Sequence, residues 1–447
     1  MLSDTRWYRS YQASTVAAAP LGGLGIGRAN TRISFSPLRS TRDDVNLSWH
    51  WVTEQRTMSA AIEIRKGLEG VVADTTSLSL VDGEAGQLYY RGYPVESLVQ
   101  HAFADVVHLI VFGELPGAAR RAEVEEFLWQ AGRLPSRLAV SLRALASHGA
   151  HPMATLQAIT PLLSLEPNSE TLGRSREEHE GLLIAARIPA AIALIHAVRG
   201  GSAEAPYPES RRYGERYLQL VTRRAVAPSD VAVFECMQIL QLDHGFNAST
   251  FTARVVTSTL APPASALAAA MGALYGPLHG AADQGALEMA LEVDGPEHAS
   301  EFVARCLSSG RIVMGMGHRE YRVVDPRAKV IRAMADKIAT DASLRRVFDT
   351  LTAVEAAFVA QTSTKRRALR ANLEFYKGVV CLGLGIPKEL FTATFAASRI
   401  FGWVAHVIEQ RKENRIIRPS AHYVGPPPRR VEPEIPGSGA DAAAAGR

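Results

Sequence analysis

Apolar residues recur at intervals of three and four along most of this 447-residue chain, which is the period of an amphipathic α-helix. The pattern predicts helices at residues 119–131, 136–147, 177–198, 229–242, 249–260, 264–274, 281–291, 298–308, 328–340, 343–360 and 388–411. Pro387 precedes the last of these, as is common at a helix start. Segments 70–81 and 87–90 are predicted to be short strands or extended arms. Since strands and helices do not alternate, we expect an all-α fold without a parallel α/β sheet.

The two ends of the chain lack a periodic apolar face. Residues 1–57 are rich in Arg, Ser and aromatic residues, and the Arg-rich, acid-poor stretch 5–42 is compatible with an organelle transit peptide. The acidic pair and the tryptophans that follow show no cleavage pattern, so we favour a disordered or mis-assigned leader with Met58 as the true start. The tail, residues 429–447, is rich in Pro, Gly and Ala and is predicted to be disordered.

Composition narrows the class of protein. Hydrophobic residues make up 47% of the chain and charged residues 21%, and a net charge of +4 is too small and too evenly spread to indicate nucleic-acid binding. Charged residues interrupt the longest apolar runs, so no membrane span is expected. Cys236, Cys306 and Cys381 are far apart and lack metal-ligand spacing. They indicate packed thiols in the cytoplasm, or in the mitochondrial matrix if the leader is a transit peptide.

Candidate chemistry is concentrated in the C-terminal half, where three histidines stand in Gly-marked turns and three arginines follow them. These residues are His244, His279 and His318, then Arg327, Arg399 and Arg418. Histidine exchanges protons near neutral pH, and arginine binds carboxylates with a planar fork of donors. Arg399 lies in an apolar helical stretch, where a buried cation without an anion is costly. The set predicts a site that binds a small di- or tricarboxylate and moves protons on it.

A metal site is the main alternative for the three histidines. They come from three distant turns without zinc-ligand spacing, and only His279 has a carboxylate one helical turn on, at Asp283. We therefore expect no metal. Taken singly, His279 is equally well explained as a buried turn histidine, and His244 as a histidine favoured at the C-terminus of a helix.

Several motifs resemble those of one family in sequence and in order. Among them are Asp243-His244-Gly245-Phe246-Asn247, Gly276-Pro277-Leu278-His279-Gly280, Gly315-Met316-Gly317-His318-Arg319, Asp325-Pro326-Arg327 and Asn414-Arg415-Ile416-Ile417-Arg418-Pro419. With further motifs before them, they cover nearly all of residues 66–428 and resemble the citrate synthase family, which includes the 2-methylcitrate synthases.

The resemblance implies a two-domain, all-α citrate synthase fold. The large domain would consist of residues 58–280 and 385–428, and the small domain of residues 281–384, with the two closing over substrate. It also implies a homodimer of the dimeric type, in which Arg418 completes the partner's site.

The reaction implied by the resemblance condenses acetyl-CoA with oxaloacetate and water to give citrate and CoA. His279 would donate to the thioester oxygen, His318 would polarise the ketone, and His244, Arg327, Arg399 and Arg418 would bind oxaloacetate. The implied CoA contacts are Gly315, Met316, Gly317, Arg322, Lys365 and Arg366. The basic run at 365–367 is equally well explained as a solvated helix end. The acyl-CoA is a substrate, and no separate cofactor is implied.

The sequence departs from the family at the catalytic base, where most members carry Asp. Here the segment reads Asn372-Leu373-Glu374-Phe375-Tyr376, and the resemblance assigns the base to Glu374. Asp and Glu have similar acidity, so the difference lies in reach, and a misplacement of about 1 Å can lower a rate about 100-fold.

Three functions remain open from the sequence. One methylene separates acetyl-CoA from propionyl-CoA, which is worth about 1–3 kcal/mol of discrimination, so 2-methylcitrate synthase stands beside citrate synthase. A non-catalytic subunit that binds oxaloacetate or CoA is the third, and Glu374 is the only feature that favours it.

Overall fold

The structure is a computed structural model, and it describes residues 64–165, 172, 175–363 and 369–429. The chain divides into two compact units, residues 1–71 and 72–447. Of the first, only residues 64–71 are described, and they contain a 3-10 turn, η2 (Lys66–Leu68). The predicted leader, residues 1–57, and the tail from residue 430 onward lie outside the described residues.

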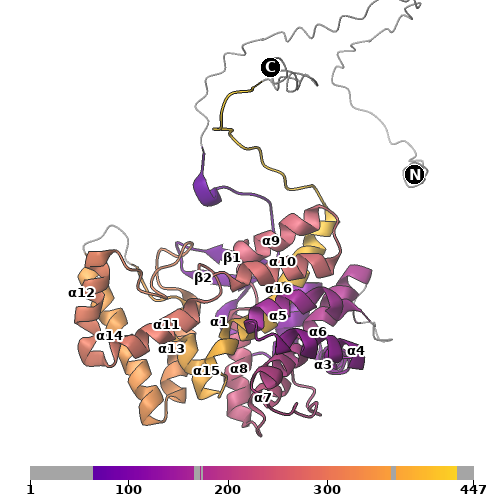
Figure 1. The fold of residues 1–447 in the computed structure, drawn as a ribbon, viewed down its shortest axis with the longest axis horizontal. Helices are drawn as coiled ribbons and strands as arrows, with labels where there is room; N and C mark the ends of the chain where they lie inside the picture. The colour runs from indigo at the N-terminus through magenta and orange to yellow at the C-terminus, as the bar shows by residue number, and fades with distance from the viewer. Residues whose placement is uncertain (1–63, 166–171, 173–174, 364–368, 430–447) are drawn as a thin grey trace, which may run out of the picture. The chain divides into compact units, whose positions relative to one another are not determined.

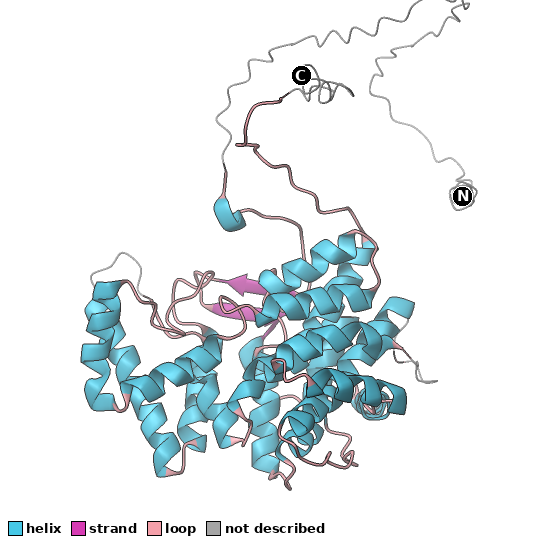
Figure 2. Cartoon of the chain, viewed as in Figure 1, coloured by secondary structure: helices cyan, strands magenta, loops and turns pink. Residues whose placement is uncertain are grey.

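The described part of the second unit is built mainly from α-helices, with one small antiparallel sheet (Figure 1, Figure 2). In chain order the elements are β1 (Ser79–Asp82), β2 (Gln87–Tyr90), β3 (Tyr93–Pro94), α1 (Val95–Leu98), α2 (Phe103–Phe112), α3 (Ala118–Ala131), α4 (Ser136–Ser147), α5 (Pro152–Ile159), η3 (Thr160–Ser164), α6 (Arg176–Arg199), α7 (Tyr213–Thr222), α8 (Pro228–Leu240), α9 (Ala248–Ser258), α10 (Pro263–Tyr275), α11 (Ala282–Val293), η4 (Pro296–His298), α12 (Ala299–Ser309), α13 (Pro326–Ile338), α14 (Ala342–Thr362), α15 (Leu373–Gly383), η5 (Lys388–Leu390) and α16 (Phe391–Lys412). The predicted all-α class is confirmed.

Each helix predicted from the apolar period is present with closely similar bounds, although the last begins as the 3-10 turn η5 before α16. The sequence analysis missed α1, α2, α5, α7 and α15. Of the two predicted extended segments, 87–90 is strand β2, whereas only the end of 70–81 is a strand, β1.

The sheet joins two loops of the later chain. Leu80 pairs with Tyr89 across β1 and β2, and the turn between these strands accepts a hydrogen bond at Gly83 O from Arg322 N, at 2.9 Å. Ser79 of β1 donates to Asp243 Oδ2 at 2.6 Å. The sheet therefore holds the loop after α8 and the loop before α13 in place.

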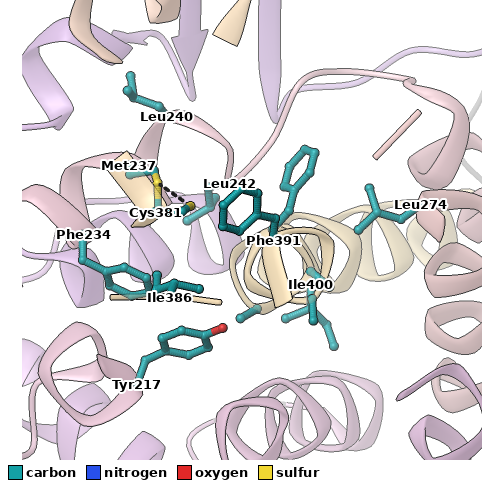
Figure 3. Close-up of a cluster of buried hydrophobic side chains, with 14 of the residues drawn as sticks. Tyr217, Phe234, Met237, Leu240, Leu242, Leu274, Cys381, Ile386, Phe391 and Ile400 are labelled. Atoms are coloured by element: carbon teal, nitrogen blue, oxygen red, sulfur yellow. Dashed lines mark hydrogen bonds between the residues drawn. The ribbon is translucent and has the colours of Figure 1, made fainter. Parts of the chain in front are cut away.

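The core is centred on α6 and α16. Both are long and apolar enough to span a membrane. Yet 83% of an apolar 18-residue stretch of α6, and 94% of such a stretch within Lys388–Lys412, is buried within the protein. Figure 3 shows part of this core, where Phe391 and Ile400 of α16 lie among side chains of other helices, and Cys381 of α15 contacts Met237 of α8. The apolar character of these helices thus matches a central position among packed helices.

Gly402 lets α16 lie directly against the loop after α8. A Cβ atom at this position would overlap the carbonyl oxygen of Leu242 and would come within 3.3 Å of Asp243 Cβ. Because a backbone atom cannot move aside as a side chain can, a larger residue here must displace the helix or the loop.

We expect Gly402→Ala to lower the free energy of unfolding by about 1–3 kcal/mol through this overlap. Gly272→Ala in α10 is the matched control, because its new methyl group would meet only the end of the flexible Gln157 side chain. Thermal denaturation followed by circular dichroism should show a lower melting temperature for the first variant only. Equal melting temperatures would mean that the close approach at Gly402 is not a constraint.

Candidate active site

Arg399 is the most unusual charged residue of the described structure. It lies in the middle of α16, only 2% exposed, with Nε donating to Gln241 O at 2.6 Å and its guanidinium 4.7 Å from the Phe395 ring centroid. Within the described residues no carboxylate lies within ion-pair distance of it. Burial lowers its pKa to about 10, which still leaves it protonated at neutral pH. An unpaired buried cation of this kind is a ready site for an anion.

Arg327 carries the second buried guanidinium, but it is paired. Asp325 caps the N-terminus of α13 and binds Arg327 in a bidentate ion pair, with Nε to Oδ1 at 3.0 Å and Nη2 to Oδ2 at 2.8 Å. Burial opposes both charges, yet the pair raises the pKa of Arg327 and lowers that of Asp325. This fixes the orientation of the Arg327 fork.

His318 accepts hydrogen bonds at Nδ1 from the backbone N–H groups of Glu320 (3.0 Å) and Tyr321 (3.2 Å). A backbone N–H can only donate, so in the neutral ring the proton is on Nε2. Nε2 lies 3.4 Å from Arg327 Nη2, which is also a donor. Two donors that converge in this way suit an oxygen acceptor between them.

His244 lies beside His318, with ring centroids 5.1 Å apart, and its Nε2 is 3.2 Å from the Tyr321 hydroxyl. Burial, and then the positive charge of Arg327, hold the pKa of His244 well below its ordinary value. His244 is therefore neutral at pH 7. Tyr321 was missed by the sequence analysis, and its position three residues after His318 was the only signal for it.

His279 lies in the turn between α10 and α11 and contacts Ser249 at the start of α9. Its Nε2 lies 2.8 Å from the Ser249 hydroxyl and accepts from Ser249 N at 3.4 Å, which places the proton of the neutral ring on Nδ1. Burial, followed by the charge of Arg399, lowers the His279 pKa to about 4. No hydrogen-bond partner for Nδ1 is present in the described part of the chain, so this N–H is available to a ligand.

Glu374 lies in the first turn of α15, half-buried, and its backbone N–H donates to Asn372, the N-cap of that helix, at 3.1 Å. Burial has the largest effect on the pKa values of His279, Arg327 and Arg399, and it lowers each of them. The negative charge of the Glu374 carboxylate acts in the opposite direction on all three. The carboxylate is thus close enough to act electrostatically on each of these groups.

The loop of Gly315, Met316 and Gly317 pairs with the segment just before α15. Gly317 N donates to Arg370 O at 2.7 Å, Asn372 N donates to Gly315 O at 3.0 Å, and Asn372 Nδ2 donates to Gly317 O at 3.1 Å. Gly315 has a positive φ of 76° and a Cβ there would overlap the Phe375 ring, so glycine is required. The loop is therefore held directly against the helix of Glu374.

Two of the predicted contacts, Arg322 and Arg418, are not gathered with this group. Arg322 is largely exposed and forms an ion pair with Glu84 at 2.6 Å. Arg418 is exposed in the segment after α16, which Ser258 anchors through Ile417 N at 3.0 Å. Lys365 and Arg366 lie outside the described residues.

A buried polar chain behind the site was not predicted. Asp243 accepts a hydrogen bond from Ser79, and its Oδ1 lies 3.1 Å from His406 Nε2. The side chains of Asp243 and His406 are fully buried. On the other side of the imidazole ring, His406 Nδ1 lies 3.2 Å from Arg254. Arg254 also forms an ion pair with Glu409 at 2.8 Å. Burial raises the pKa of Asp243, but His406, the charge of Arg399 and the Ser79 hydrogen bond together lower it below its ordinary value. In the sequence, only the apolar residues around His406 could have indicated this row of buried polar side chains.

Of two cavities in the described part of the protein, one borders these residues. One of about 520 Å³, between α4, α6 and residues 204–207, has none of the predicted site residues in its lining. The other, of about 990 Å³, borders the His279 turn through Pro277 and Ala281 and reaches Met314. Among the described residues, no three His, Cys, Asp or Glu side chains are arranged to hold a metal ion.

Comparison with known proteins places this arrangement in context. The family profile for citrate synthase, C-terminal domain, matches residues 67–420. The chain is 33% identical to citrate synthase 2 of Bacillus subtilis, over 82% of this chain and 98% of that protein, and 36% identical to 2-methylcitrate synthase of Shewanella oneidensis, over 82% and 96%.

Solved structures of citrate synthases have folds similar to that of this chain. A ternary complex of citrate synthase from Thermoplasma acidophilum with carboxymethyl coenzyme A and oxaloacetate has a TM-score of 0.77, at 28% identity, over 83% of this chain and 98% of that one. Citrate synthase from Thermotoga maritima has a TM-score of 0.74, at 30% identity, with the same coverage.

The lowered pKa of His279 predicts a pH dependence of stability. Between pH 6.5 and about 4 the unfolded imidazole is protonated while the folded one is not, so the free energy of unfolding falls as the pH falls through this window. We expect the parent protein to lose about 2 kcal/mol more than His279→Gln between pH 7 and 4.5. Urea denaturation at the two pH values measures this, with exposed His148→Gln as the control. An identical loss in parent and His279→Gln would contradict the burial of a neutral His279.

Proposed function

The chain belongs to the citrate synthase family, and on that premise we propose that its histidines and arginines form the site where an acyl-CoA condenses with oxaloacetate. It is an enzyme of the citrate synthase class, and its reaction converts acetyl-CoA, oxaloacetate and water to citrate and CoA. The observation that carries the assignment of the site is Arg399, a buried cation that lacks a carboxylate partner within the described residues.

Oxaloacetate is proposed to supply the missing anion. One carboxylate would bind Arg399, and the other would approach the oriented fork of Arg327, which Asp325 holds. The ketone oxygen would accept from His318 Nε2, the donor that already points toward Arg327. His244, neutral because of its burial, would add a further contact without adding charge. The structure of the Thermoplasma acidophilum relative with oxaloacetate supports this choice of substrate.

The acyl-CoA is proposed to react between Glu374 and His279. Glu374 would take a proton from the carbon next to the thioester, while His279 Nδ1–H donates to the thioester oxygen on which negative charge develops. The carbon then forms a bond to the ketone carbon of oxaloacetate, whose oxygen His318 polarises. Water finally cleaves the thioester and releases CoA. In this scheme the acyl-CoA is consumed as a substrate and no separate cofactor takes part.

The CoA body is proposed to lie along the loop of Gly315, Met316 and Gly317, with Arg322, Lys365 and Arg366 as phosphate contacts. The cavity beside Pro277 offers room near the His279 turn. Because this loop is hydrogen-bonded to the start of α15, binding of CoA there would act directly on the position of Glu374.

A homodimer and a cytoplasmic location complete the proposal. Arg418 stands exposed after an anchored segment, as expected of a residue that completes the site of a second copy of this chain. All three cysteines, Cys236, Cys306 and Cys381, are buried free thiols, which suits a reducing compartment. The division into a large domain (58–280 and 385–428) and a small domain (281–384) is part of the same proposal.

A second candidate is 2-methylcitrate synthase, which would use propionyl-CoA. The 36% identity to the Shewanella oneidensis 2-methylcitrate synthase favours it, since this value is as high as those to the citrate synthases. The third reading, a non-catalytic subunit, is disfavoured because the predicted histidines gather with Arg327, Arg399 and Glu374 in one place.

We expect the purified protein to release free CoA only when oxaloacetate and a short acyl-CoA are both present, as measured by a colorimetric thiol reagent. Comparison of acetyl-CoA with propionyl-CoA decides between the two substrates. Glu374→Gln keeps the shape but removes the base, so turnover should fall by orders of magnitude while oxaloacetate still binds. Equal release without oxaloacetate would indicate a simple thioesterase and contradict the condensation.

We expect Arg399→Lys to raise the KM for oxaloacetate at least about tenfold, because lysine lacks the planar fork that binds a carboxylate with two parallel hydrogen bonds. The exposed Arg305→Lys in α12 is the control and should leave the KM unchanged. Circular dichroism checks that both variants are folded. An unchanged KM in the Arg399 variant would assign this residue a structural role only.

A further inference from the structure

A fully buried ion pair lies one helical turn behind the proposed reacting groups. Lys377 Nζ is 3.0 Å from Asp283 Oδ2, and the two side chains are 1% and 0% exposed. Lys377 follows Glu374 by three residues on α15, which places both on one face of the helix. Asp283 follows His279 by four residues, in the first turn of α11.

The pair therefore connects the two helices that set the position of the base and of the thioester-oxygen donor. Helices α11 and α15 pack against each other. Asp283 also accepts at Oδ1 from Gln284 N at 2.8 Å, so its carboxylate is tied to the start of α11. A change in the Lys377–Asp283 distance would shift one helix against the other at the level of His279 and Glu374.

Lys377 also reaches toward the proposed oxaloacetate site. Its Nζ lies 3.3 Å from Gln241 Oε1 and 4.2 Å from the Phe395 ring centroid. Arg399 uses the backbone oxygen of the same Gln241 and lies over the same ring. Because Arg399 bonds the backbone rather than the Gln241 side chain, its own anchor does not depend on Lys377.

A buried ion pair is weak support for stability, because desolvation of both charges offsets most of their attraction. Replacement of a buried ion pair by uncharged residues of similar volume is often neutral or stabilising. The retention of two buried charges directly behind Glu374 and His279 is better explained by the geometry that the pair imposes, since proton transfer is sensitive to displacements of about 1 Å.

We propose that the Lys377–Asp283 ion pair is a positioning element that sets the separation between the Glu374 carboxylate and the His279 imidazole, and so controls proton abstraction from the acyl-CoA rather than oxaloacetate binding. The inference rests on the proposed function. It adds to it two positioning residues, neither of which touches substrate in this scheme.

The test compares charge removal with lengthening of the pair. Lys377→Met alone strands a buried carboxylate and should lower the melting temperature strongly, whereas Lys377→Met with Asp283→Asn removes both charges and should recover most of that loss. Asp283→Glu keeps the charges but adds one methylene, so it remains informative if the double variant does not fold. Arg212→Met with Glu235→Gln, a partly exposed pair between the start of α7 and α8, is the control for loss of an ion pair elsewhere in the fold.

In the double variant and in Asp283→Glu we expect kcat to fall about 10- to 100-fold. The Kd for oxaloacetate, measured by calorimetry, should stay within about twofold, and a kinetic isotope effect with acetyl-CoA deuterated on the methyl group should increase as proton abstraction becomes rate-limiting. The control pair should leave kcat and the isotope effect unchanged.

The result that would overturn the proposal is a folded double variant, or a folded Asp283→Glu variant, with parental kcat and isotope effect. The pair would then be purely structural. A loss of oxaloacetate affinity with unchanged kcat would also overturn it, by assigning the pair to the other substrate. Absence of turnover in the parent protein, with both acyl-CoA substrates and oxaloacetate, would instead contradict the proposed function itself.

Discussion

The proposed site depends on one buried charge, that of Arg399. Arg399 is a protonated guanidinium in the centre of a packed helix, and within the described residues it has no carboxylate partner. A cation in such surroundings is costly unless an anion reaches it. Around it the chain supplies partial compensation only, from the carbonyl oxygen of Gln241, the face of the Phe395 ring and the more distant charges of Asp243 and Glu374. The fold thus keeps a deficit of negative charge that a dicarboxylate substrate can fill.

The neighbouring groups are arranged so that they do not fill that deficit themselves. Asp325 is committed to Arg327 by two hydrogen bonds, and Asp243 is committed to His406 and Ser79. Both carboxylates are therefore held away from Arg399 by partners of their own. Burial likewise keeps His244 and His279 neutral, so that they offer hydrogen bonds without adding positive charge to the ligand-free site. Because Asp325 and Asp243 have partners of their own, Arg399 remains able to bind the carboxylate of a substrate.

The sequence could predict most of the long helices and it named candidate residues for the site, but it could not predict most of the contacts that hold these residues in place. Helices α2, α7 and α15, which were missed, are only 10, 10 and 11 residues long, and a segment of that length offers few repeats of the helical period. The Lys377–Asp283 pair spans 94 positions of the chain, and no local pattern encodes such a partner. In contrast, Arg399 could be identified, because an arginine within an apolar helical stretch is informative by itself.

The same network bears on Glu374, the proposed base, whose side chain is one methylene longer than that of Asp. The Asn372 side chain caps α15 through Glu374 N and also binds Gly317 O, so the start of the helix is fixed both to its own backbone and to the Gly315–Gly317 loop. One turn further on, Lys377 fixes the helix to α11. With α15 held at two successive turns, the extra methylene of Glu374 cannot be absorbed by sliding of the helix. It is then taken up by the Glu374 side chain itself, either by a bent rotamer or by a displacement of the carboxylate of up to about 1.5 Å, the length of one C–C bond. In the proposed scheme, the position of the base is therefore a joint property of Glu374 and of the buried pair behind it.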